Sequence, residues 1–216
     1  MKTIKAFNWQ IGFLTTVCII LLIFRVFMTE NFRYIFLIWN LILAYVPYFI
    51  ASRINTESIP MPIKLVLICV WLVFFPNAPY LVTDFVHINH STSAVIWFDV
   101  VLLFMFAYTG MYMAIKSADV IHTWLISKLG NGLAILTIII SFLLSGFGIY
   151  LGRVERWNSW NIINQPFSLL NEILQLILKK NVWEFSIVYF ILIGSVYVIY
   201  RSEQERIKKE DLRYRT

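Results

Sequence analysis

The chain has 216 residues, of which 60% are hydrophobic and only 14% are charged. A soluble domain has about a quarter of its residues charged, so this composition excludes an ordinary water-soluble domain and indicates a protein embedded in lipid. The net charge of +6 suits anionic lipid head groups as well as nucleic acid. In a chain this apolar we expect membrane lipids, and no nucleic acid, as partners. Neither cysteine has a CxxC or Cys/His context, so no disulfide and no zinc knuckle are predicted.

Six segments are long and apolar enough to cross a bilayer as helices, because a hydrocarbon core of about 30 Å requires about 20 helical residues. They cover residues 9–28, 34–51, 64–87, 94–116, 132–152 and 182–200. Arg25 occupies the place where a signal peptide would be cleaved, so the first segment is expected to remain as a span. The predicted fold is all-α, a polytopic membrane helix bundle. Residues 1–200 are expected to form a single integral membrane domain, followed by a basic tail over 201–216.

Six spans place both termini on the same side of the membrane. Of the 18 Lys and Arg residues, twelve lie on that side and six on the other. The positive-inside rule therefore predicts cytoplasmic N- and C-termini. Six of the twelve belong to the tail, so without it the two sides would be equal at six each.

The segment 153–181 is too polar to cross the membrane, but its later part has the pattern of an amphipathic helix. Pro166 suits a helix start, and a helix near 166–180 would separate apolar from polar side chains. Its apolar face would hold Phe167, Leu170, Ile173, Leu174 and Ile177. This helix is expected to lie in the outer interface of the bilayer, with an ordinary connecting helix as the alternative.

The third span contains helix breakers near its end, in the stretch FPNAPY over residues 75–80. Pro76 and Pro79 lack amide donors and predict a kink or a break over Pro76–Pro79. Asn77 can cap a restarted helix, whose amide-rich N-terminus would attract an anion, as in the broken helices of transporters. A plain proline kink, satisfied by neighbouring helices, is the alternative.

Polar residues follow this break at helical spacing. At about 100° per residue, Asn77, Tyr80, Asp84 and His87 fall on one side of a helix, and His90 extends the series as D-x-x-H-x-x-H. Carboxylate and imidazole groups suit a divalent metal such as zinc or manganese, held by Asp84, His87 and His90. Without metal, the same groups suit acid–base catalysis. Polar side chains wetted by lipid head groups at a helix exit are the third interpretation, and all three stay open.

Further polar residues are expected in the same leaflet. Span three leaves the membrane where span four enters and span five leaves, whichever way the protein faces. This leaflet collects Asp99, Arg153, Arg156, Asn158 and Trp160, with Arg25 ending span one at the same level. A carboxylate within a span requires a partner, and Arg153 or Arg156 can supply it. Such a pair fixes helix packing, while arginines three apart on one helix face also suit a phosphate or carboxylate ligand.

Two further polar positions have simpler interpretations. Asn40, inside the second span, is expected to hydrogen-bond another helix. His122 is expected in a solvated loop on the opposite side of the membrane, with Asp119 and Lys116.

Three blocks between residues 39 and 161 carry a family resemblance: WNLILAYVP, WLVFFPNAPYLVTDFVH and GFGIYLGRVERWNSWN. Together they resemble the DUF1361 family of uncharacterised bacterial multi-pass membrane proteins. The resemblance implies a bacterial plasma membrane location and one shared site, but no activity. The family pattern matches Asn77, Pro79, Tyr80, Thr83, Asp84, His87, Asp99, Arg153, Arg156, Asn158 and Trp160. It ends with an acidic residue after that tryptophan, where this chain has Asn161. An acid or metal role is therefore not expected at that position.

Three classes of function fit these residues. The first is a membrane-embedded hydrolase or transferase acting on a lipid-linked or phosphate-bearing substrate, with Asp84, His87 and Asp99 as catalytic residues. Asn77, Tyr80, Arg153, Arg156, Asn158 and Trp160 would then bind the ligand. The second is an accessory or structural membrane protein whose polar layer fixes helix packing. The third is a transporter or small-ligand binding protein. The lack of an internal repeat in the sequence argues against this class.

Overall fold

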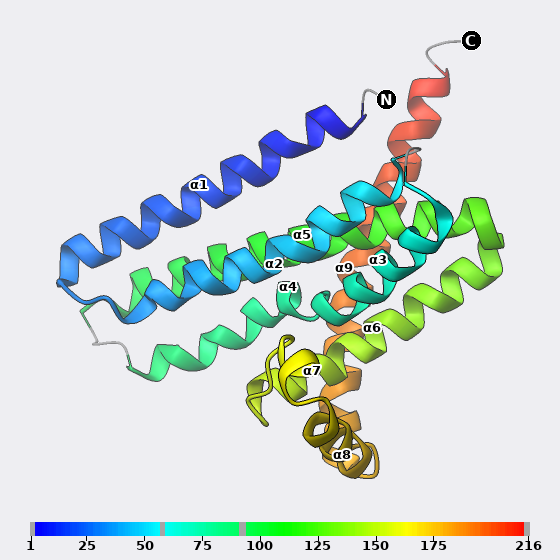
Figure 1. The fold of residues 1–216 in the computed structure, drawn as a ribbon. Coiled ribbons are helices and arrows are strands. Elements are labelled where there is room, and N and C mark those ends of the chain that lie inside the picture. Colours follow the sequence, from blue (N-terminus) through cyan, green and yellow to red (C-terminus); the bar gives the residue numbers. More distant parts are fainter. Residues whose placement is uncertain (1–2, 57–58, 91–93, 214–216) are drawn as a thin grey trace. The chain divides into compact units, whose positions relative to one another are not determined.

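The fold was obtained as a computed structural model, which describes residues 3–56, 59–90 and 94–213. Within these residues all regular structure is helical (Figure 1), which confirms the predicted all-α class. The elements are α1 (Thr3–Thr29), η1 (Arg33–Ile35), α2 (Phe36–Ile54), α3 (Met61–Phe74), α4 (Asn77–Tyr80), η2 (Leu81–His90), α5 (Ile96–Leu129), α6 (Asn131–Arg153), α7 (Asn161–Asn164), α8 (Pro166–Leu176) and α9 (Lys180–Arg213).

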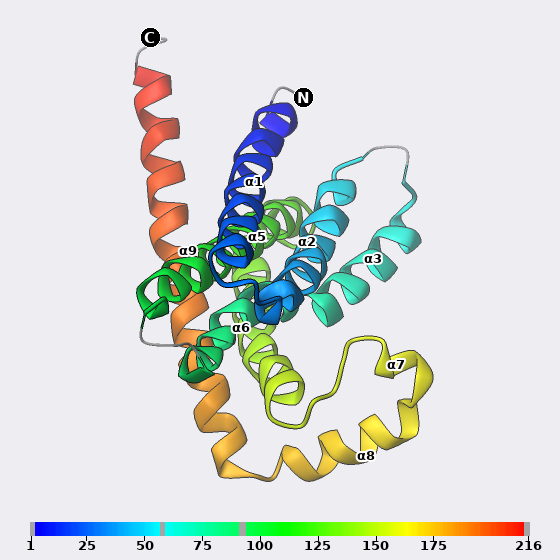
Figure 2. The same cartoon turned by 90° about the vertical axis from the view of Figure 1, so that its left-hand side faces the viewer.

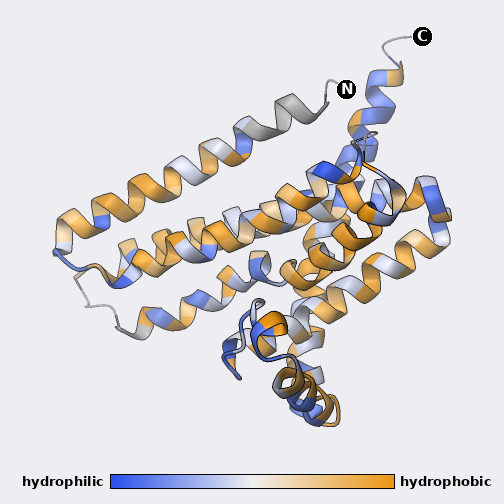
Figure 3. Cartoon of the chain, in the orientation of Figure 1, coloured by the Kyte–Doolittle hydropathy of each residue, from blue (hydrophilic) through white to orange (hydrophobic). Residues whose placement is uncertain are grey.

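Six helical segments of the described chain are long and apolar enough to cross a membrane, as predicted. They cover Trp9–Thr29, Arg33–Ile54, Met61–Ile88, Ile96–Leu129, Asn131–Arg153 and Lys180–Arg213. Their outward surfaces are apolar, and Phe27 is 88% exposed, as expected for side chains that face lipid. The chain is therefore a multi-pass membrane protein. Figure 3 shows α9 changing from hydrophobic to hydrophilic toward its C-terminal end, so much of the predicted tail continues this helix.

The chain divides into two compact units, Met1–Ser117 and Ala118–Thr216, and α5 contributes to both. In the first unit α2 packs beside α3 and α4. Close approach between α5 and α4 depends on Gly110, because a Cβ at this position would overlap the Ala78 carbonyl oxygen.

In the second unit α6 packs along α9. Gly146 allows this contact, since a Cβ there would overlap the backbone of Ser186. Figure 2 shows α7 and α8 joining the end of α6 to the start of α9. Leu176 of α8 packs into an apolar cluster with Phe147, Tyr150 and Val182.

The amphipathic helix begins at Pro166, as predicted, but its apolar residues divide between two surfaces. Leu169 and Leu176 are buried, and Ile173 packs against the cluster of α6 and α9. Phe167 and Leu174 remain 81% and 57% exposed. Its location in the outer interface of the bilayer stays a prediction.

The third span is interrupted at its prolines, as predicted. Two backbone amides after the break have partners within the chain. The amide of Ala78 donates to the Phe75 carbonyl at 3.2 Å. The amide of Tyr80 donates to the Pro76 carbonyl at 3.0 Å, while Pro79 has no amide to offer. The four-residue α4 therefore presents few open amides at its start, and anion binding at this break stays a prediction.

Candidate functional site

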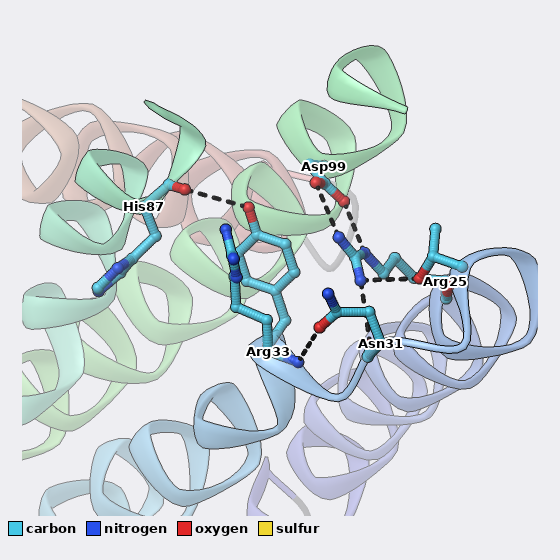
Figure 4. A network of polar contacts seen from close by, with 7 residues as sticks. Arg25, Asn31, Arg33, His87 and Asp99 are labelled. Carbon is cyan, nitrogen blue, oxygen red and sulfur yellow. Dashed lines mark hydrogen bonds and ion pairs between the residues drawn. The ribbon is translucent and has the colours of Figure 1, made fainter. Parts of the chain in front are cut away.

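A buried ion pair joins α1 to α5 in the first unit (Figure 4). The Arg25 Nε donates to Asp99 Oδ1 at 3.0 Å, and its Nη2 donates to Oδ2 at 3.3 Å. The side chains are 5% and 0% exposed. Two parallel hydrogen bonds between a guanidinium and a carboxylate form the strongest geometry available to such a pair. Asp99 thus has the buried partner that its position requires, although the sequence suggested Arg153 or Arg156.

The remaining donors of Arg25 tie together the end of α1 and the connection to α2. Its Nη1 donates to Thr29 Oγ1 at 2.8 Å and to the Asn31 carbonyl at 3.0 Å. The guanidinium carbon lies 4.9 Å from the ring centroid of Tyr34, within the range of a cation–π contact. The Tyr34 hydroxyl in turn donates to the backbone carbonyl of His87 at 3.3 Å (Figure 4). Through Tyr34 of η1, one arginine therefore connects α1, η1, η2 and α5.

Asp84 lies on η2, where the backbone follows 3₁₀ geometry and not the α-helix assumed from the sequence. Residues three apart eclipse in a 3₁₀ helix, so Asp84 and His87 align more closely than the sequence predicts. Asp84 is only 1% exposed and accepts a hydrogen bond from the Asn40 amide at 2.8 Å. This bond confirms the expected role of Asn40 as a link between helices.

His87 stands one 3₁₀ turn after Asp84 and is half-buried. Its ring lies against that of Phe36, with centroids 4.8 Å apart. Phe36 and Asn40 are four residues apart on α2 and share one helix face. Asp84 and His87 therefore meet the same face of α2, with the carboxylate buried and the imidazole partly accessible.

Asn77 does not have the predicted capping role. Its side-chain amide donates to the carbonyl of Phe74 at 3.0 Å, which satisfies the last residue of α3, and no side chain caps the start of α4. Tyr80 ends α4 half-buried, and its backbone carbonyl accepts a hydrogen bond from the Thr83 hydroxyl at 2.7 Å. Both residues lie close in the chain to Asp84, but their role in ligand binding stays a prediction.

The predicted metal site is not tested by the described side chains. Among them, no three His, Cys, Asp or Glu residues come together as a metal-binding group. The side chain of His90, the third predicted ligand, lies outside the described part of the chain. Zinc or manganese at Asp84, His87 and His90 therefore stays a hypothesis.

The remaining predicted residues belong to the second unit. Arg153 ends α6, whereas Arg156 lies beyond it with a φ of 60°, so the two do not share one helix face as predicted. The backbone amide of Asn158 donates to the Asn161 side chain at 2.7 Å, and Trp160 directly precedes α7. Their placement beside Asp84 and His87 stays a prediction.

A family model described as "Protein of unknown function (DUF1361)" matches residues 39–196. The chain belongs to the DUF1361 family. No curated protein and no solved structure matches it. The DUF1361 match covers Asn40, Asp84, His87 and Asp99, while Arg25 lies before its first residue.

Two features of this DUF1361 protein were missed in the sequence. The first is the pairing of Arg25 with Asp99, because spacing along the chain does not show which of several arginines is adjacent. His122 was expected in a solvated loop, yet it lies within α5, is 6% exposed and contacts Tyr197. The length of the continuous helical pattern beyond residue 116 was the available signal.

Proposed function

We propose that this protein is a membrane-embedded hydrolase or transferase that acts on a lipid-linked or phosphate-bearing substrate at one face of a bacterial plasma membrane. Asp84 and His87 are the proposed acid–base pair. The observation that supports this most is their arrangement on η2, a buried carboxylate one turn before a half-buried imidazole. With both termini in the cytoplasm, this site would face the outer leaflet.

The proposed chemistry assigns different roles to the two side chains. An imidazole changes its charge near neutral pH and can move a proton when substrate reaches it, so His87 is the proposed general base or acid. Asp84, held by Asn40, is the proposed group that orients His87 and balances its charge. A bound zinc or manganese ion would instead activate water, with Asp84, His87 and His90 as ligands.

Other residues have binding or positioning roles in this proposal. Arg153 and Arg156 would hold the phosphate, because a guanidinium matches two phosphate oxygens at once. Asp99, first considered as catalytic, is now proposed as a positioning residue because its two oxygens accept from Arg25. It would hold α5 against α1 beside the site.

The test uses purified full-length protein in liposomes of phosphatidylglycerol and phosphatidic acid, with lipid products and released phosphate followed by mass spectrometry. Wild type is expected to convert one of these lipids, and Asp84→Asn and His87→Gln are expected to lose at least about 100-fold of that rate. Asp211→Asn, on the exposed end of α9, is the matched control and should retain the rate. Unchanged lipids with folded wild-type protein would contradict the proposal for these substrates.

Elemental analysis of the same preparations decides the metal hypothesis. One equivalent of zinc or manganese in wild type that is lost in His87→Gln would support it. Absence of stoichiometric metal from both would leave acid–base chemistry alone.

A second candidate is an accessory membrane protein whose polar layer fixes helix packing. The observation that favours it is the engagement of Arg25 with Asp99, Thr29 and Asn31 within the protein itself. This candidate predicts that changes at Asp84 reduce stability and leave no lipid conversion to lose.

A further inference from the structure

A second polar cluster lies in the second unit, between the last turns of α5 and the middle of α9. The His122 Nδ1 lies 2.6 Å from the Tyr197 hydroxyl, and both residues are 6% exposed. One turn from them, Arg201 donates to Asp119 at 2.7 Å. The cluster therefore combines an imidazole, a phenol and an ion pair.

Among the residues that the structure describes, one nitrogen of the His122 imidazole has no hydrogen-bond partner. Within the described part of the chain, its Nε2 is buried and makes no hydrogen bond. Leaving a buried polar atom unsatisfied costs about 1–3 kcal/mol, so such an atom in a folded protein calls for an explanation. The direction of the Nδ1–Tyr197 hydrogen bond depends on the tautomer, and the proposal below takes the Nδ1–H form, in which Nε2 keeps a free lone pair.

The cluster lies where the two helices leave the predicted membrane crossings. α5 and α9 each contain 34 residues, more than the roughly 20 needed to span the hydrocarbon core. The predicted crossings end near residues 116 and 200, so His122 and Arg201 come just after them in the sequence.

We propose that His122 is a proton-binding site, in which Nε2 takes up a proton from the water phase on the side of the α5–α6 connection. The neutral imidazole becomes an imidazolium, Nδ1–H keeps its hydrogen bond to Tyr197, and no other covalent bond changes. The charged groups that face the ring are Asp119 from its own helix and Arg201 from α9. From α6, the neighbouring contact is the apolar ring of Phe142 against Tyr197.

Proton uptake would change the contacts that join α5 to α9. The new imidazolium would attract the Asp119 carboxylate and repel the Arg201 guanidinium, which now bind each other. The site thus provides a way for pH on one side of the membrane to alter the packing of these two helices. This inference does not depend on the proposed lipid chemistry at Asp84.

The test is a titration of the histidine rings in full-length protein, labelled with ¹⁵N and held in lipid nanodiscs. The chain has three histidines, so His87→Gln and His90→Gln identify the His122 signal without altering that residue. The His122 ring is expected to be an Nδ1–H tautomer at high pH and an imidazolium at low pH, with the change between about pH 5 and 8.

Charge variants test the assigned neighbours. Asp119→Asn should move the midpoint to lower pH and Arg201→Gln should move it to higher pH, each by about one unit, because they remove charges of opposite sign. Glu184→Gln, which breaks the exposed Lys180–Glu184 pair, is the control and should leave the midpoint in place. A His122 ring that keeps one protonation state over this range would overturn the proposal. So would a midpoint that moves in the same direction, or not at all, in both charge variants.

Discussion

The ion pair between Arg25 and Asp99 provides the sharpest prediction about stability. Replacing Arg25 by Gln removes both hydrogen bonds to Asp99, at 3.0 and 3.3 Å, and leaves a carboxylate that is 0% exposed without its cation. Breaking one partner of a buried ion pair costs about 3–5 kcal/mol, because the remaining charge stays out of water. We therefore expect Arg25→Gln to lower the free energy of unfolding by that amount.

An exposed ion pair of the same chemistry serves as the control. Arg206 and Glu203 on α9 are 2.7 Å apart, but their side chains are 66% and 50% exposed. Exposed pairs contribute about 0–1 kcal/mol, so Arg206→Gln should have little effect. The double variant Arg25→Met with Asp99→Leu should recover most of the lost stability, since it leaves no buried charge.

The measurement is reversible unfolding of purified protein in mixed micelles with increasing SDS, followed by far-UV circular dichroism. The three variants and wild type are compared at the same lipid-to-protein ratio. The reasoning would be refuted if Arg25→Gln cost no more than Arg206→Gln, or if the double variant were as unstable as the single one.

Three further substitutions test single contacts between helices and use the same unfolding assay. Gly146→Ala should cost about 1–3 kcal/mol, because its methyl group would overlap the Ser186 backbone. In Gly194→Ala the new methyl group has no atom within 4 Å, so this change should raise the free energy of unfolding by about 0.5–1 kcal/mol. Equal effects of Gly146→Ala and Gly194→Ala would be inconsistent with the α6–α9 contact. Asn40→Ala should cost about 1–3 kcal/mol because it removes the donor at 2.8 Å from the buried Asp84, and a neutral effect would argue against that bond.

The membrane architecture could be predicted from the sequence because lipid imposes strong constraints on length and composition. A run of about 20 apolar residues has few alternatives to a spanning helix, and two prolines three residues apart cannot continue a regular one. The break at Pro76–Pro79 was therefore predictable. The hydrogen bonds around the break were not predictable, because whether the Asn77 side chain caps the new helix or the old one depends on small differences in local geometry.

The polar contacts were predictable only in part. A carboxylate inside a span must find a partner, so the need of Asp99 for a cation followed from its position. The choice of Arg25 depends on how α1 packs against α5, which no periodicity in either helix specifies. His122 was misplaced for a different reason: the helix continues well beyond the length that the membrane requires, and hydropathy alone ends it too early.

We propose a division of roles between the two buried carboxylates, in which Asp99 holds the helices and Asp84 takes part in the chemistry. It is tested most directly by measuring both unfolding free energy and lipid conversion on the same samples of Asp84→Asn and Asp99→Asn. We expect Asp99→Asn to lose most of its stability, whereas Asp84→Asn should stay close to wild type in stability and lose lipid conversion. Equal losses of stability in both variants, with no lipid conversion in wild type, would contradict it.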